Sequence, residues 1–85
     1  MNEAALARVQ AVKSAHEAEL LRKANVVGVG IGLRQRGGQG TGELAIVVSV
    51  AEKVSVSVLA PRDVIPRELE GIPVDVQAVG ILRAL

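Results

Sequence analysis

The sequence predicts an α+β domain, in which one N-terminal amphipathic helix packs on a three- to four-stranded mixed or antiparallel sheet. Three observations predict this class. Apolar residues recur with a helical period over residues 2–24, and the period changes to strand-like alternation at Val26. The third is the length of 85 residues, which suffices for one compact domain. We therefore expect a single domain over residues 1–85, with a helix at 2–24, a sheet within 26–79 and an apolar C-terminal tail at 80–85.

The first segment has the composition of a helix. Asn2 can cap its start, Glu3 suits the first turn, and Ala, Leu, Arg, Lys and Glu dominate the rest. Asn25 stands where a left-handed residue would end the helix. At about 100° per residue, one side of this helix carries a stripe of Ala5, Leu6, Val9, Val12, His16 and Leu20. A one-sided stripe of this kind is typical of a helix that covers a sheet.

The segment VVGVGIG at residues 26–32 predicts a strand that lacks side chains on one face. Gly28, Gly30 and Gly32 point one way, while Val27, Val29, Ile31 and Leu33 point the other. Glycine weakens a strand, so three of them in alternation need a reason, and bare backbone permits close approach by another element. The nearest candidate is the N-terminal helix, and the other is a neighbouring chain.

A second strand is predicted at Glu43–Ala51, after the polar, glycine-rich connection RQRGGQGTG at residues 34–42. Leu44, Ile46, Val48 and Val50 form one face of this strand, and the other face, with Val47, is also largely apolar. A strand that is apolar on both faces usually lies centrally in its sheet.

The rest of the chain predicts extended structure interrupted by prolines. VSVSVL at residues 54–59 alternates valine with serine, which indicates an extended segment with its serines toward water. Residues 67–70 have room for at most one helical turn, ended by Gly71. A last strand is predicted at residues 72–79, where Pro73 suits a strand start or an edge.

Composition excludes several classes of function. The net charge of +1 and the absence of aromatic residues disfavour nucleic acid and acidic membranes as partners. The absence of cysteine excludes disulfides and thiolate chemistry, and the sequence shows no signal peptide or apolar run of membrane-spanning length. We expect a cytoplasmic location. The hydrophobic share of 49%, all of it aliphatic, favours contact with a partner chain.

The glycine stretch does not have the context of a nucleotide-binding loop. Its glycines lie inside a strand at a spacing of two, and a polar turn and another strand follow, whereas a nucleotide loop leads into a helix. Arg34, Arg36 and the backbone amides of residues 34–42 could still bind an anion. A solvated hairpin loop is the simpler interpretation of that connection.

No catalytic group, metal site or cofactor site is predicted. His16 is the one histidine and has Glu19 close by, which is typical of a packed helix residue. No serine stands in a nucleophile elbow, and the acidic residues are dispersed. The predicted contact residues are instead apolar or bare, and we expect them to mediate homo-oligomerisation: Gly28, Gly30, Gly32, Val47, Val54, Val56 and Val58.

The order of segments resembles a known family. NVVGVGIGLR, a glycine-rich turn, TGELAIVVSVAEK and then LAPRDVIPRELEGIPVDVQAVG are similar to the N-terminal domain of bacterial trypsin-like serine peptidases related to the plant narrow-leaf proteins. The similarity covers roughly residues 24–83, with the helix as looser support. It implies a non-catalytic domain, because the peptidase triad of that family lies downstream of it.

Two functional hypotheses follow. The first is a non-catalytic assembly module that associates with itself. The second is the N-terminal, positioning domain of a longer trypsin-like serine peptidase, with the linked peptidase domain as its partner. Anion or nucleotide binding at the glycine-rich hairpin is a minor third.

Overall fold

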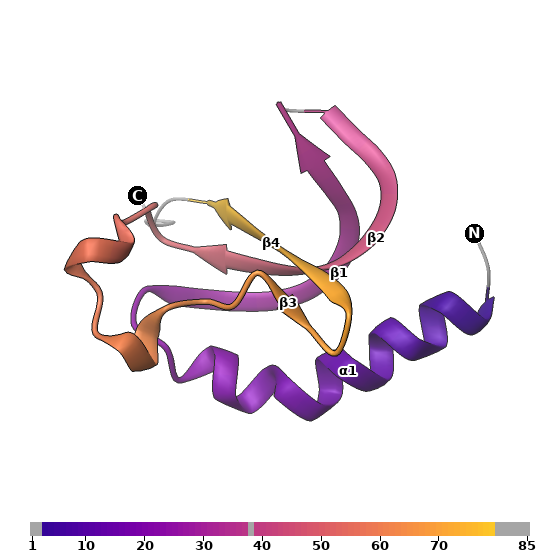
Figure 1. Cartoon of the computed structure of the whole chain (residues 1–85), viewed down its shortest axis with the longest axis horizontal. Coiled ribbons are helices and arrows are strands. Elements are labelled where there is room, and N and C mark those ends of the chain that lie inside the picture. The colour runs from indigo at the N-terminus through magenta and orange to yellow at the C-terminus, as the bar shows by residue number, and fades with distance from the viewer. Residues whose placement is uncertain (1–2, 38, 80–85) are drawn as a thin grey trace, which may run out of the picture.

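A single helix lies across one face of a four-stranded sheet in the computed structural model, which describes residues 3–37 and 39–79 (Figure 1). The strand order is β1-β2-β4-β3, with β1–β2 and β3–β4 antiparallel and β2–β4 parallel. The predicted α+β class with a mixed sheet is confirmed. The elements are α1 (Glu3–Leu21), β1 (Val26–Arg36), β2 (Gln39–Val50), β3 (Glu68–Leu69) and β4 (Ile72–Ala78), with short 3₁₀ turns η1 (Val56–Val58) and η2 (Pro61–Asp63).

α1 is held on the sheet by the apolar stripe that the sequence predicts. Val9, Val12 and Leu20 are buried, whereas Ala5 at the edge of the stripe is exposed. The helix ends at Leu21 and does not reach residue 24. Asn25 then adopts the predicted left-handed conformation, with φ of 74°.

The core lies between α1 and the helix-facing side of the sheet. β2 supplies its centre and is a central strand, as predicted, because a strand pairs with it on each side. The buried core side chains are Val9, Val12, Leu20, Ile46, Val48, Val50 and Ile72. With no aromatic ring available, this layer is built from aliphatic groups alone.

The glycine-rich connection at residues 34–42 is mostly paired strand and not a loop. Gln35 pairs with Gly40, and Arg36 pairs with Gln39. The ladder continues past an irregularity between Leu33 and Gln35, where the hairpin bends. Figure 1 shows the far end of this hairpin turned away from α1.

The prediction of extended structure over VSVSVL is wrong. Val56–Val58 form a 3₁₀ turn, and the Ser55 and Ser57 hydroxyl oxygens lie 2.9 Å apart. Serine competes for hydrogen bonds with neighbouring groups, and no strand pairs with this segment, so the local arrangement prevails. The valine–serine alternation therefore adds no strand to the sheet.

The predicted helical turn at residues 67–70 is also absent. Glu68 and Leu69 form β3 and pair with Pro73 and Ile72. The two residues between the strands, Glu70 and Gly71, have φ of 50° and 82°. Two consecutive positive φ values are the signature of a tight hairpin turn whose twist matches its strands.

β4 lies inside the sheet, parallel to β2, with Ile46 opposite Val74 and Val50 opposite Ala78. Pro73 stands near the start of this strand, as predicted. The expected tail at 80–85 lies outside the described residues. Within the described part of the chain, no helix is long and apolar enough to cross a membrane.

Candidate interaction surface

The three glycines lie on the sheet face that is turned away from α1. Val29 and Ile31, which alternate with them, pack against the core beneath the helix. The expectation that α1 approaches the glycines is therefore wrong, because the helix covers the opposite face. We call the open hollow on this face the glycine trough. Its floor and walls include Gly28, Gly30, Gly32, Gln35, Gly40, Val47, Ser49 and Gln77.

The chain's own packing does not require two of these glycines. A Cβ atom at Gly30 would meet no atom within 4 Å, and one at Gly28 would lie 3.8 Å from Ser49 Cβ, which is ordinary contact. Only at Gly32 would a Cβ be crowded, at 3.1 Å from Val47 Cγ2. None of the three has a positive φ. Packing among the described residues therefore does not explain why glycine stands at positions 28 and 30.

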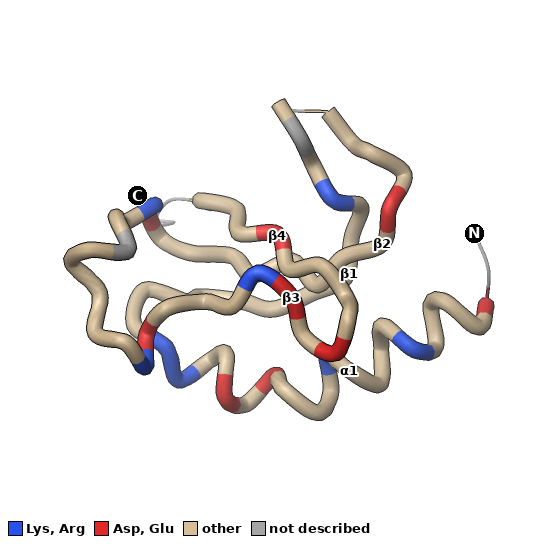
Figure 2. The backbone as a smooth tube through the Cα atoms, viewed as in Figure 1, with Lys and Arg blue, Asp and Glu red and all other residues tan. Residues whose placement is uncertain are grey.

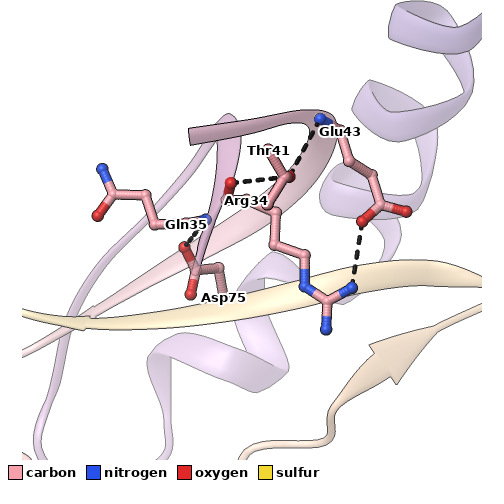
Figure 3. A network of polar contacts seen from close by, with 5 residues as sticks. All are labelled: Arg34, Gln35, Thr41, Glu43 and Asp75. Carbon is pink, nitrogen blue, oxygen red and sulfur yellow. Dashed lines mark hydrogen bonds and ion pairs between the residues drawn. The ribbon is translucent and has the colours of Figure 1, made fainter. Parts of the chain in front are cut away.

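One end of the trough is shaped by the irregularity in the β1–β2 hairpin. Thr41 Oγ1 donates to the Arg34 carbonyl oxygen at 2.9 Å and accepts from the Glu43 amide at 3.3 Å (Figure 3). Gly42 between them has φ of 82°, a conformation that favours glycine. The Arg34 guanidinium lies 3.1 Å from the Glu43 carboxylate. These contacts set the bend.

A carboxylate from β4 fastens the bent hairpin. The backbone amide of Gln35 donates to Asp75 Oδ2 at 3.1 Å (Figure 3), and Gln77 Nε2 donates to the same oxygen at 3.0 Å. Asp75 lies opposite Val47 in the sheet, on the trough face. It therefore joins β4 directly to the outer strand across β2. The sequence gives no local signal for this contact, because the two partners stand 40 residues apart.

The sequence alternation predicts that Val27 shares the core face with Val29 and Ile31. In the structure it does not. The register shifts between Val26 and Gly28, which leaves Val27 out of the pairing. Val26 packs against the core in its place, and Val27 is 57% exposed. A β-bulge of this kind breaks the strict alternation that sequence patterns assume.

The predicted contact residues fall into two groups. Gly28, Gly30, Gly32 and Val47 come together in the trough. The others belong to the connection between β2 and β3, away from the trough floor. Val54 lines a separate pocket with Leu59 and Ile65, Val58 is 71% exposed, and the side chain of Val56 lies outside the described part.

His16 has a structural partner that the sequence does not reveal. Its Nε2 lies 3.0 Å from Glu70 Oε2, while Nδ1 lies 3.9 Å from Glu19 Oε2. Arg8 donates to the Glu70 carbonyl oxygen. These contacts attach α1 to the turn between β3 and β4. These contacts anchor the helix.

Charge is distributed unevenly over the backbone. α1, the hairpin end and the long connection carry Lys, Arg, Asp and Glu, whereas β1 from Val26 to Leu33 carries none (Figure 2). Arg34 is paired with Glu43, which weakens the case for an anion site at the hairpin. Among the described residues, no three side chains of the His, Cys, Asp or Glu types are grouped to hold a metal ion.

Comparison with known proteins gives one family. Residues 3–79 match the family model described as the NARROW LEAF 1 N-terminal domain. A search of curated proteins returns no match for the chain. The matched range includes α1, all four strands and every residue of the glycine trough.

Proposed function

Because the chain belongs to the NARROW LEAF 1 N-terminal domain family, we propose that it is a non-catalytic module that associates with itself into a homo-oligomer. One observation carries the proposal: Gly28 and Gly30 leave a sheet face bare although no atom of the described chain needs that space. The trough is the surface offered for contact, and its lining combines backbone, Val47 and Ser49.

The energetic cost of the three glycines favours contact with a partner. A glycine inside a strand costs roughly 0.5–1 kcal/mol relative to alanine, so the three alternating glycines together cost on the order of 2 kcal/mol. Small domains have a total stability of only about 5–15 kcal/mol. Close contact between the backbone of β1 and a partner would offset this loss of stability. α1 does not provide that contact, because it covers the other face of the sheet.

Light scattering coupled to size-exclusion chromatography tests this function. We expect the molar mass to rise above that of the 8.8 kDa chain as concentration increases from micromolar to millimolar. Gly30→Val places a branched side chain in the trough and should lower the mass below that of the natural chain at the same concentration. The matched control Ala7→Val, at an exposed position of α1 on the opposite side, should leave the mass unchanged. A monomer at every concentration would exclude self-association.

A second candidate is that the module positions a peptidase domain within a longer chain. The family description names an N-terminal domain, which favours this reading, and the segment order resembles that of bacterial trypsin-like serine peptidases. The coding sequence beyond residue 85 provides the test. A downstream frame with a Gly-Asp-Ser-Gly segment would support a linked peptidase, and a stop codon directly after Leu85 would count against it. The cytoplasm stays the expected location in both cases.

A further inference from the structure

The two edges of the sheet are built differently. At one edge, β3 has only two residues, with Pro66 just before it, and its Glu68 pairs with Pro73 of β4. Short strands and prolines are devices that prevent a sheet edge from pairing with another chain. The other edge is β1, which has 11 residues and no strand on its outer side among the described residues. From Val26 to Leu33 it carries neither a charge nor a proline.

We propose that the outer edge of β1 pairs, antiparallel, with β1 of a second copy of this chain, about a two-fold axis at Gly30. The inference rests on the proposed function and identifies the contact through which self-association begins. It uses backbone donors and acceptors that β1 turns away from β2, as strand addition does in other proteins.

The register follows from the two faces of β1. Residues directly opposite each other in an antiparallel pair point to the same face. A two-fold pair therefore places a residue opposite one of the same parity. With the axis at Gly30, Gly28 lies opposite Gly32 of the partner subunit, and Val29 lies opposite Ile31 of the partner subunit. The charge-free residues 27–33 are then symmetric about the axis. The glycine face of β1 in one copy continues into the glycine face of β1 in the other.

Charge also fits a second copy. A groove on the helix side of the same edge is lined by Gln10, Lys13 and Ser14 above Val29–Ile31. Lys13 Nζ lies 3.1 Å from Glu17 Oε1, so the two charges compensate each other. The two-fold axis therefore brings one neutral Lys13–Glu17 pair from each copy toward the other. Shifting the axis to Ile31 would instead bring Arg34 beside Gly28 of the partner subunit, inside the paired stretch. The register at Gly30 keeps that arginine near the end.

The size of the contact predicts a reversible dimer. Seven paired residues, 27–33, give an edge of about 23 Å, and a strand layer with its helix layer is about 20 Å thick, so roughly 450 Å² is covered on each copy. The sum of about 900 Å² lies below the roughly 1,200 Å² of stable interfaces, in the range of weak, transient contacts. We therefore expect dissociation on dilution. The pairing also joins the two glycine troughs into one continuous bare surface.

Single-cysteine variants test the register directly, because the natural chain contains no cysteine. Gly30→Cys places a thiol opposite its own copy, at a Cα separation of about 4.5–5.5 Å that a disulfide can bridge. Under mild oxidation we expect Gly30→Cys to form a covalent dimer at least tenfold faster than Gly40→Cys. The control is matched because a Cβ at either glycine meets nothing within 4 Å, and Gly40 lies on β2.

A second pair of variants tests the edge without a cross-link. Lysine on an edge strand blocks pairing. Val27→Lys changes an exposed residue that is left out of the β1–β2 ladder, so the monomer should fold normally. We expect it to abolish dimers in sedimentation experiments and to slow the cross-linking of Gly30→Cys to the rate of Gly40→Cys. Val79→Lys, at an exposed valine just after β4, should do neither.

The outcomes separate this inference from the proposed function. If the natural chain forms oligomers that Val27→Lys leaves intact, and Gly30→Cys cross-links no faster than its control, self-association stands and the β1 pairing is overturned. If the natural chain is monomeric at all concentrations and Gly30→Cys again matches its control, both fail. Faster cross-linking of Gly30→Cys that Val27→Lys suppresses supports the pairing.

Discussion

Gly28, Gly30 and Gly32 are equivalent in sequence but differ in their surroundings. The sequence identifies all three as a bared strand face, which the structure contains. It cannot rank them, because the crowding at Gly32 depends on the position of one methyl group of Val47 on the neighbouring strand. It also assigns the covering element wrongly, since the side of the sheet on which a helix packs is a tertiary property.

Alanine substitutions separate the roles of these glycines. At a concentration where the chain is monomeric, Gly30→Ala should raise the free energy of unfolding by about 0.5–1 kcal/mol, because it reduces the entropy of the unfolded chain and meets open space. Gly32→Ala should gain less or lose stability, since its Cβ would lie 3.1 Å from Val47 Cγ2. Urea unfolding measures both. A Gly32→Ala variant as stable as Gly30→Ala would contradict the packing described for the trough.

The side chain of Asp75 links β4 to the bent hairpin. Asp75→Ala removes the acceptor of the Gln35 backbone amide and should lower the free energy of unfolding by about 1.5–3 kcal/mol, as for a hydrogen bond to a charged group. Hydrogen exchange at the backbone amide of Gln35 should accelerate. Glu43→Ala removes only an exposed ion pair and should cost less than about 1 kcal/mol. Equal losses in the two variants would show that Asp75 does not hold the hairpin.

At the scale of elements, apolar periodicity predicts the secondary structure well in segments that have a buried face. α1, β2 and β4 follow their apolar patterns to within a few residues. Two segments differ: VSVSVL alternates without forming a strand, and residues 34–42 look like a loop yet pair as strands. The first has no neighbour to pair with, and the second is held by contacts such as that of Asp75. Neither condition is visible in a local window.

Two adjacent leucines test the attachment of α1. Leu20 is 2% exposed and packs in the core, whereas Leu21 is 46% exposed. Leu20→Ala should lower the free energy of unfolding by about 2–4 kcal/mol, because it removes buried methyl groups and leaves a cavity. Leu21→Ala should change it by less than about 0.5 kcal/mol. Thermal and urea unfolding followed by circular dichroism give both values, and similar losses would contradict the orientation of the helix.

For the whole molecule, small net charge and an uncharged β1 make self-association a matter of backbone and aliphatic contact. We expect the dissociation constant of the dimer to change by less than about threefold between about 0.05 M and 0.5 M salt, since screening acts on charges. Analytical ultracentrifugation at both salt concentrations measures this constant. A loss of affinity of tenfold or more would point to ion pairs, and therefore to a surface other than the β1 edge.

The position of β4 has a consequence for how the chain is made. It is the last strand in the described part of the chain, yet it lies between β2 and β3. When the ribosome has released residues 1–71, the helix and the long hairpin have emerged, but one side of β2 still has no neighbouring strand. Ile46, Val48 and Val50 then lack the cover that β4 and its turn provide. Nascent chains at this stage are candidates for chaperone binding, and synthesis must reach the final strand before the sheet closes.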